Sequence, residues 1–233
     1  MVLAAGFGKR LRPVTETVPK PLVKVAGVPL IDTVLDRLAA VGVREAVVNT
    51  HHLAEQIETH LKDRQRPRIR FSHEPEILET GGGVRRALPH LGSAPFYVVN
   101  AKIIWLNGKI DALLRLAQAW DDAAMDALLL LHPTVTGVGY SGLGDFFLDQ
   151  LGRVRRRRAW EVAPFLFTGI QILHPRLFDG APEGAFSLNV LYDRAIEAGR
   201  LHAIRHDGEW FHVSTPRQLA AVEAHLQRGV RFA

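Results

Sequence analysis

The sequence predicts an α/β protein with a Rossmann-like three-layer sandwich around a mixed, mostly parallel sheet. Its 233 residues are 47% hydrophobic and 23% charged, which is typical of a folded chain long enough to form one continuous core. Short apolar runs alternate with segments of helical periodicity, as they do in parallel strands joined by crossover helices. No change in composition marks a linker. We therefore expect one domain over residues 1–233, with ligands bound at the carboxyl ends of the strands.

The first half of the chain carries the regular alternation. Residues 1–5 form a short apolar run that predicts a buried strand, and the prolines within 6–22 predict a long, stiff connection rather than an immediate helix. Apolar residues at helical spacing over 30–40, followed by Gly42, predict a helix. Further strands are expected over 46–49, 68–71, 96–99 and 127–131, and further helices over 53–61, 81–91 and 111–120.

The second half is less regular. Residues 146–148 and 154–158, separated by Gly152, predict a hairpin, and residues 165–173 predict another strand. Helices are expected over 188–198 and 215–226. We therefore expect a small β-rich region around residues 140–175 within the same domain.

The composition excludes several classes of protein. The chain has no cysteine, which removes disulfide frameworks, thiol nucleophiles and cysteine-ligated metal centres. No apolar run approaches the roughly 18 residues of a membrane span, and the first residues lack the pattern of a signal peptide. We expect a cytoplasmic protein with no membrane contact. The first strand begins at Met1, which leaves open a shortened chain, and no feature indicates an oligomeric state.

The positive charge is concentrated in one segment. Lysine and arginine number 29 against 24 acidic residues, a formal net charge of +5, and the five arginines at 153 and 155–158 equal that whole excess. Such a cluster could bind nucleic acid, yet like charges on a hairpin also oppose edge-to-edge pairing of strands. We favour a solvated hairpin edge and do not expect nucleic acid as a partner.

A glycine-rich segment follows the first strand. It runs Leu-Ala-Ala-Gly-Phe-Gly-Lys-Arg-Leu-Arg-Pro over 3–13, and Pro-Lys-Pro-Leu follows over 19–22. Glycines let backbone N–H groups approach a phosphate closely, and Arg10 and Lys20 supply positive charge, so the segment fits a triphosphate. A Rossmann dinucleotide fingerprint fails because Leu11 stands at the third glycine position, and a Walker A loop fails because neither Gly-Lys-Ser nor Gly-Lys-Thr occurs.

These residues resemble the signature of the sugar-phosphate nucleotidyltransferases. The similarity continues in Gly27 with Pro29-Leu30, in Leu-Glu-Thr-Gly-Gly-Gly over 78–83, in Phe-Thr-Gly-Ile over 167–170, and in Trp210 before Thr215-Pro216. It covers nearly the whole chain. The greatest resemblance is to the short bacterial group of N-acetylmuramate 1-phosphate uridylyltransferase-like enzymes.

The resemblance implies a reaction and a set of site residues. An oxygen of a sugar 1-phosphate would attack the α-phosphorus of a nucleoside triphosphate, UTP by resemblance, and release pyrophosphate. Cations and backbone amides would do most of the catalysis because the nucleophile is the substrate itself. The implied catalytic residues are Arg10 and Lys20, and the implied cofactor is Mg²⁺. The implied nucleotide-binding residues are Leu3, Ala4, Ala5, Gly6, Gly8, Thr80, Gly81, Gly82 and Asn100, and the implied sugar-contacting turn is Thr168 and Gly169, within the region around 140–175. Glu161 and Asn189 are further candidates, either for contacts to sugar hydroxyl groups or for water-mediated metal binding.

Two positions depart from the pattern that the resemblance implies. Where the family has Asn, then Gly or Ser, then the Asp that binds magnesium, this chain has Asn100, Ala101 and Lys102, and His212 replaces a second Asp. At an effective dielectric constant near 20, a lysine about 4 Å from a divalent ion is repelled by roughly 8 kcal/mol. Magnesium is therefore not expected in its usual place.

Three explanations for Lys102 stay open at this point. Its ammonium could replace the metal at the phosphates. The chain could instead be an impaired enzyme, or a non-enzymatic protein that binds a nucleotide or a nucleotide-sugar. In the third explanation, the lysine turns out to solvent and leaves a weakened site.

Two histidines and two tryptophans are less informative about a site. His51 and His52 have no carboxylate or histidine at regular ligand spacing, which favours polar residues at a helix entry over a metal site. Trp105 and Trp160 are expected to be packing residues rather than platforms for a base.

Overall fold

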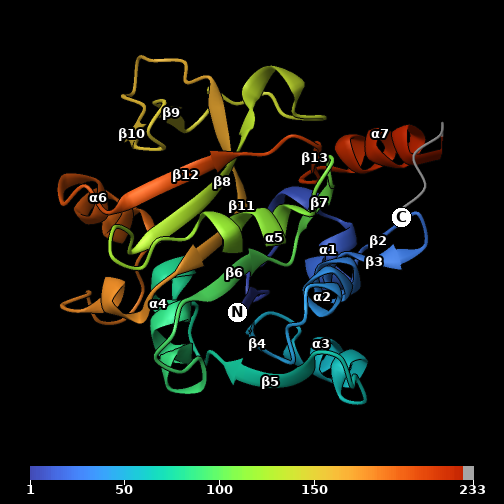
Figure 1. Cartoon of the computed structure of the whole chain (residues 1–233). Helices are drawn as coiled ribbons and strands as arrows, with labels where there is room; N and C mark the ends of the chain where they lie inside the picture. Colours follow the sequence, from blue (N-terminus) through green and yellow to red (C-terminus); the bar gives the residue numbers. More distant parts are fainter. Residues whose placement is uncertain (228–233) are drawn as a thin grey trace.

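The computed structural model describes residues 1–227, which are built around a nine-stranded sheet (Figure 1). Seven strands form its main path in the order β10 (Val154–Arg156), β9 (Phe146–Leu148), β11 (Phe165–Leu173), β6 (Phe96–Asn100), β1 (Val2–Leu3), β4 (Glu45–Thr50) and β5 (Arg68–His73). Two more strands, β8 (Ala127–Pro133) and β12 (Leu201–Arg205), continue the sheet beside β11.

The parallel half of the sheet comes from the alternating first part of the chain. The short strand β1 pairs in parallel with β4 on one side and with β6 on the other, so that Val2 lies between Val48 and Val99. β5 continues the parallel pairing beyond β4. Because parallel strands run in one direction, their carboxyl ends meet at one edge of the sheet. The segments that follow these four strands therefore gather at that edge.

The other half of the sheet is mainly antiparallel. β11 pairs antiparallel with β6 and β8, and the β9–β10 hairpin adjoins β11. The register of β11 against β8 shifts between Phe167 and Gln171, where Gly169 has a φ of +85°. A glycine suits such an irregularity because a side chain is strained in this backbone conformation. The predicted mixed sheet is confirmed.

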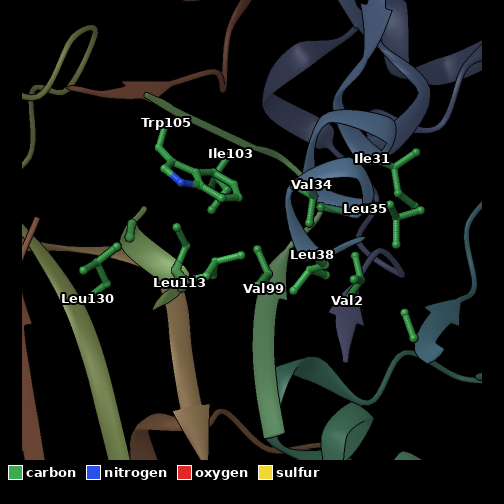
Figure 2. Packing of buried hydrophobic residues seen from close by; sticks show 14 of the residues in the cluster. Val2, Ile31, Val34, Leu35, Leu38, Val99, Ile103, Trp105, Leu113 and Leu130 are labelled. Carbon is green, nitrogen blue, oxygen red and sulfur yellow. The ribbon is translucent and has the colours of Figure 1, made fainter. Parts of the chain in front are cut away.

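Helices cover both faces of the sheet. α2 (Leu30–Ala40), α3 (Ala54–Leu61) and α5 (Ala112–Ala119) pack on one face, and α4 (Glu79–Ala87) and α6 (Asn189–Glu197) on the other. Successive strand residues serve opposite faces, since Val48 packs with the first group and Val47 with the second. Figure 2 shows Leu38 of α2 beside Val2 and Val99. Each such buried aliphatic side chain contributes about 1.5–3 kcal/mol. The predicted three-layer arrangement is confirmed.

A smaller layer lies beside the main sheet. β7 (Ile103–Leu106) pairs antiparallel with β13 (Glu209–His212), and β2 (Lys24–Val25) pairs with β3 (Val28–Pro29). Their apolar side chains pack with α7 (Pro216–Gln227) in a third core cluster. Leu11 is fully buried in this cluster, which gives a physical reason for leucine at this position.

The predicted elements are present with shifted ends. The helix expected from residue 81 begins at Glu79, and the strand expected over 154–158 ends at Arg156. The strands β2, β3, β7, β12 and β13 were not predicted, because segments of two to five residues show too few periods for a pattern. Within residues 1–227, no helix is long and apolar enough to cross a membrane.

The two tryptophans have different environments. Trp105 is fully buried among the helices on one face of the sheet, as expected. Trp160 is 79% exposed, so the prediction that it is a packing residue is wrong. It lies in the turn after β10, where no second layer covers it.

Candidate active site

A cavity of about 490 Å³, which we call the main cavity, lies at the carboxyl edge of the parallel strands. This volume is in the range of small-molecule sites. Its lining comes from the segments that follow β1, β4, β5 and β6, from the start of α4 and from the segment before α6. The lining residues are Leu3, Ala4, Ala5, Gly6, Phe7, Gly8, Lys9, Arg10, Lys20, Pro21, Asn49, Glu74, Ile77, Glu79, Thr80, Asn100, Lys102 and Ser187. The structure therefore brings together most of the residues predicted for the nucleotide, together with both predicted catalytic residues.

The glycine-rich loop turns sharply after β1. Gly8 has a φ of +64° and begins the 3-10 turn η1 (Lys9–Leu11). A β carbon at Gly8 would lie 2.9 Å from Cγ2 of Thr15 and 3.1 Å from Cβ of Lys20, so only glycine fits. The turn buries Leu11 and leaves Arg10 exposed at the cavity. Thr15 Oγ1 donates a hydrogen bond of 2.9 Å to the Gly8 carbonyl and fixes the turn.

His51 and His52 support this loop from the end of β4. The Phe7 ring lies edge-on to His51, with 5.3 Å between centroids, and 5.5 Å from the ring of His52. Hydrogen bonds of 3.1 Å and 2.8 Å join His52 Nε2 to the carbonyl of Thr15 and His51 Nδ1 to the carbonyl of Glu74. Both histidines thus have structural partners just before α3, which confirms their interpretation as polar residues at a helix entry.

Four cations line the cavity without an acidic partner in the described part of the chain: Lys9, whose ammonium lies over the Phe7 ring, and Arg10, Lys20 and Lys102. Lys20, in the 3-10 turn η2 (Lys20–Leu22), is only 6% exposed. Burial, followed by the positive charges of Lys102 and Arg10, lowers the pKa of Lys20 to about 7. The side chain of Lys102 is exposed at the cavity, and desolvation by the surrounding protein, followed by the positive charge of Arg10, lowers its pKa. Unpaired cations that repel one another are suited to a polyanion such as a triphosphate.

A buried Asn–Glu pair, which the sequence interpretation missed, fixes the edge of the sheet. Asn49 Oδ1 accepts a hydrogen bond of 2.7 Å from the N–H of Ala4, and its Nδ2 donates one of 2.7 Å to Glu74 Oε1. Glu74 Oε2 accepts from the N–H of Leu78 at 2.9 Å, and Glu74 is fully buried. The pair joins the ends of three strands to the segment that precedes α4. Polar residues at or just beyond the ends of two predicted strands were the available signal.

The structure separates Thr80 from the glycines that follow it. Thr80 lines the cavity, whereas Gly81 and Gly82 lie buried in the first turn of α4 and donate their N–H groups to the Phe186 carbonyl at 2.7 and 3.1 Å. A β carbon would lie 2.3 Å from the Phe186 ring at Gly81 and 2.3 Å from the Gly184 carbonyl oxygen at Gly82. These two glycines therefore allow close packing of α4 on residues 184–186, and they do not line the cavity.

The predicted sugar-contacting turn has a structural role beside Asn100. Thr168 is fully buried and its hydroxyl donates to the Leu130 carbonyl at 2.7 Å. A β carbon at Gly169 would lie 2.5 Å from Asn100 Nδ2, so this glycine makes room for the Asn100 side chain. Neither Thr168 nor Gly169 lines the main cavity, whereas Asn100 does.

A second cavity of about 360 Å³ lies beside the β9–β10 hairpin. Its lining residues are Asp145, Phe146, Arg156, Arg157, Ala159, Phe167 and Asn189. Asn189 of this cavity is two residues from Ser187, which lines the main cavity. Glu161 lines neither cavity, because its Oε2 accepts hydrogen bonds from Arg155 Nη1 at 2.7 Å and from the N–H of Arg158 at 2.8 Å.

Three of the five arginines of the cluster form ion pairs, two with residues in or next to the hairpin and one with α6. Arg153, Arg155 and Arg156 form ion pairs with Asp149, Glu161 and Asp193 at 2.9, 2.7 and 2.7 Å. Arg157 differs, because it donates to carbonyl oxygens, including that of Gly144 at 2.8 Å, and has no acidic partner among the described residues. The pairing supports the interpretation of the cluster as a hairpin edge and leaves the guanidinium of Arg157, unpaired among the described residues, at the second cavity. Asp145 also lines this cavity, and its Oδ2 accepts a hydrogen bond from the N–H of Phe167 at 2.8 Å.

The residues at the two implied metal positions do not fit Mg²⁺, which takes oxygen ligands. Lys102 brings a positive charge, and no group of three His, Asp or Glu side chains suited to a metal occurs within residues 1–227. Burial first, then Arg10, Lys20 and Lys102, lowers the pKa of His212 to about 4, and its Nε2 is hydrogen-bonded to Ser214 Oγ. The carboxylate oxygens of Glu74 are both hydrogen-bonded elsewhere. The structure therefore provides a cation cluster where the implied metal would lie.

Comparison with solved structures shows the same fold in other proteins. A Bacillus anthracis chain, provisionally assigned as a glucose-1-phosphate thymidylyltransferase and solved with sucrose, aligns with a TM-score of 0.81 at 17% identity over 100% of this chain and 96% of its own. HddC from Yersinia pseudotuberculosis, solved with GMP-PN, aligns with a TM-score of 0.75 at 22% identity over 96% of this chain and 97% of its own. At these identities the similarity shows the fold alone.

Sequence comparison adds the family. An N-acetylmuramate alpha-1-phosphate uridylyltransferase of Caulobacter vibrioides is 43% identical over 97% of this chain and 96% of its own length. The enzyme of the same name from Neisseria meningitidis serogroup B is 35% identical over 96% of each chain. The pattern of the nucleotidyl transferase family matches residues 1–140, which include most of the main cavity. The chain therefore belongs to the nucleotidyl transferase family.

Proposed function

We propose that this nucleotidyltransferase transfers UMP from UTP to the 1-phosphate of N-acetylmuramate and releases pyrophosphate. The observation that carries the proposal is the convergence of Arg10, Lys20 and Lys102, all without acidic partners in the described residues, in a cavity at the carboxyl ends of parallel strands. The names of the two near-full-length relatives support uridine as the base and N-acetylmuramate as the sugar. The proposed product is a cell-wall nucleotide-sugar, and the requirement for a nucleoside triphosphate supports a cytoplasmic reaction.

The main cavity offers each part of the nucleotide a different lining. Gly6 is exposed and a β carbon there would meet no atom within 4 Å, so its backbone lies open to a phosphate. Arg10 is placed to hold the leaving pyrophosphate, and Lys20 the α-phosphate. Thr80 and Ser187 also line the cavity and come from other parts of the sequence than these cations. They are available to the nucleoside. These roles require positioning and charge, which is how proteins catalyse transfer at phosphorus.

The second cavity supports an acidic acceptor sugar. N-acetylmuramate carries a carboxylate that N-acetylglucosamine lacks, and the cavity provides Arg157, whose guanidinium has no acidic partner in the described residues. Carbonyl oxygens of Gly144 and Arg158 hold that guanidinium in place at 2.8 and 3.0 Å. A fixed guanidinium is the usual partner of a carboxylate. Asn189 supplies an amide to the same cavity for a sugar hydroxyl or acetamido group.

A panel of substrates tests the proposal. The purified chain is assayed for pyrophosphate release with each of the four nucleoside triphosphates against several sugar 1-phosphates, and the nucleotide-sugar product is identified by mass spectrometry. We expect the highest kcat/KM for UTP with N-acetylmuramate 1-phosphate. A higher value for another pair would replace the proposed substrates.

The alternative function is a non-enzymatic nucleotide-binding or nucleotide-sugar-binding protein. It would show nucleotide binding without pyrophosphate release across the whole panel. Family membership and the near-full-length similarity to two uridylyltransferases favour the enzyme.

A further inference from the structure

Lys102 is held at the cavity by the backbone on both sides of it. The N–H of Ala101 donates a hydrogen bond of 3.0 Å to the Leu3 carbonyl, and Ala101 is fully buried. Ile103 begins β7 and is 5% exposed. Lys102 itself lies in the turn between β6 and β7, is exposed, and lines the cavity.

The charges around Lys102 favour an anion and exclude a divalent cation. Arg10 and Lys20 line the same cavity, and His212 lies near enough to all three cations to be affected by their charge. The acidic side chains in the lining are Glu74, which is fully hydrogen-bonded within the protein, and Glu79 at the start of α4. A metal here would meet an ammonium where it needs carboxylate oxygens.

We propose that the ammonium group of Lys102 provides, at the phosphates, the positive charge that a protein-bound divalent cation would otherwise supply. The inference rests on the proposed function, and it makes nucleotidyl transfer by this chain independent of a metal bound by the protein. Lys102 is thereby a catalytic residue that touches the substrate phosphates together with Arg10 and Lys20.

The reaction needs positive charge where the pyrophosphate leaves. A phosphate oxygen of the sugar 1-phosphate forms a bond to the α-phosphorus of UTP, and the bond from that phosphorus to the oxygen that bridges to the β-phosphorus breaks. Pyrophosphate leaves with the electron pair of the broken bond. The attacking oxygen is already ionised, so no proton has to be removed and no base is required. Negative charge develops on the leaving pyrophosphate, where fixed ammonium and guanidinium groups stabilise it.

Two kinetic measurements test the inference. Pyrophosphate or UDP-sugar formation by the metal-free chain is followed in EDTA and in excess Mg²⁺, and we expect rates within about 2-fold of each other. Lys102→Met, which keeps the length of the side chain without its charge, is expected to lower kcat in EDTA by about 100-fold, as loss of one preorganised charged donor does. Complete dependence of the wild-type chain on Mg²⁺, or full activity of Lys102→Met in EDTA, would overturn the inference.

A converse variant supplies a metal site. In Lys102→Asp/His212→Asp, two carboxylates replace the ammonium and the imidazole. We expect this variant to be inactive in EDTA and to recover activity with Mg²⁺, in contrast to the wild-type chain. The matched control is Lys109→Met, because Lys109 is an exposed lysine after β7 that lines neither the main cavity nor the second cavity. A control that loses as much activity as Lys102→Met would contradict a specific role for Lys102.

A binding measurement keeps this inference separate from the proposed function. UTP is titrated calorimetrically into each variant in EDTA and in Mg²⁺. We expect the wild-type chain to bind UTP in EDTA, and Lys102→Met to bind it about 10-fold or more weakly. Absence of turnover with every substrate would refute the proposed function. Equal affinities of wild type and Lys102→Met in EDTA, or wild-type binding that requires Mg²⁺, would refute the role of Lys102.

Discussion

At the residue scale, the chemistry of the main cavity depends on cations that the fold holds close together. Arg10, Lys20 and Lys102 come from three segments of the chain, and each has no acidic partner in the described residues. Their mutual repulsion costs stability in the free protein. A bound triphosphate removes that repulsion, so the same residues that weaken the fold strengthen binding.

Nucleotide binding is expected to take up a proton at Lys20. Burial, then Lys102 and Arg10, lowers its pKa from 10.5 to about 7 in the free protein, and the charge of a triphosphate raises it again. At about pH 8 the Lys20 side chain is therefore mostly deprotonated in the free protein and protonated in the nucleotide complex. Calorimetric titration of UTP in two buffers of different ionisation enthalpy measures this uptake. It should be smaller in Lys20→Met, and an unchanged uptake in that variant would contradict the assignment.

The lowered pKa of Lys20 also determines how the free energy of unfolding changes with pH. The unfolded chain binds more protons than the folded chain between about pH 7 and the ordinary lysine value of 10.5, because only the folded state lowers the pKa of Lys20. The contribution of Lys20 to the free energy of unfolding therefore rises with pH across that window. Comparison of the pH dependence of unfolding in wild type and Lys20→Met isolates it.

Selectivity for an acidic sugar is expected to depend on Arg157. Arg157→Met should lower kcat/KM for N-acetylmuramate 1-phosphate by about 10- to 100-fold, the loss of one charge-assisted interaction, and should change kcat/KM for N-acetylglucosamine 1-phosphate much less. Arg153→Met is the matched control, because Arg153 pairs with Asp149 outside the cavity. An equal loss for both sugars would contradict carboxylate recognition.

At the element scale, the start of α4 is fixed by close packing rather than by a side-chain cap. No side chain caps this helix, and Glu79 in its first turn has a φ of +57°. Gly81 and Gly82 pack on residues 184–186, and Gly83 packs on the Asn49–Glu74 pair. The triple glycine thus serves the junction between a helix and two strand ends, and it brings Thr80 to the cavity.

The Gly83→Ala substitution is expected to destabilise that junction. The added carbon would lie 2.6 Å from Glu74 Oε1 and 2.9 Å from Asn49 Nδ2, both buried and hydrogen-bonded. Overpacking and disturbed buried hydrogen bonds together should lower the free energy of unfolding by about 1–3 kcal/mol, measured by urea denaturation. Gly6→Ala is the stability control because a β carbon there meets no atom within 4 Å. Similar losses in both variants would contradict a specific role for the pair.

At the scale of the whole molecule, the main cavity joins parts of the chain that are far apart in sequence. Its lining extends from Leu3 to Ser187 and draws on the loop after β1, four strand ends and the start of α4. The sheet also joins the β9–β10 hairpin to the parallel half through β11 (Figure 1). We expect residues 1–227 to unfold in a single cooperative transition, as one domain does.

Nucleotide binding is expected to stabilise the folded state of the whole domain against unfolding. With UTP at about 100 times its Kd, the free energy of unfolding should rise by about 2.7 kcal/mol and Tm by about 5–10 °C. Differential scanning calorimetry over a series of UTP concentrations in EDTA measures the shift. In Gly6→Ala, whose methyl group would occupy space beside the phosphates, the shift at the same UTP concentration should be smaller. Two separate transitions, with only one moved by UTP, would contradict a single cooperative unit.

Sequence by itself determined the order of the parallel strands of the main sheet and of the longer helices between them, and it predicted a phosphate-binding loop over 3–22. The reason is local: apolar periodicity reports which face of an element is buried, and glycines beside basic residues report a phosphate site. It also identified Lys102 as the residue that departs from the expected acid. Only the tertiary structure brought Lys102 together with Arg10 and Lys20 and placed His212 near them. The tertiary structure alone also separated Thr80 from Gly81 and Gly82, removed Glu161 from both cavities and placed Arg157 in one of them. These outcomes depend on contacts between segments far apart in the chain, and such contacts leave no periodic pattern in the segments that make them.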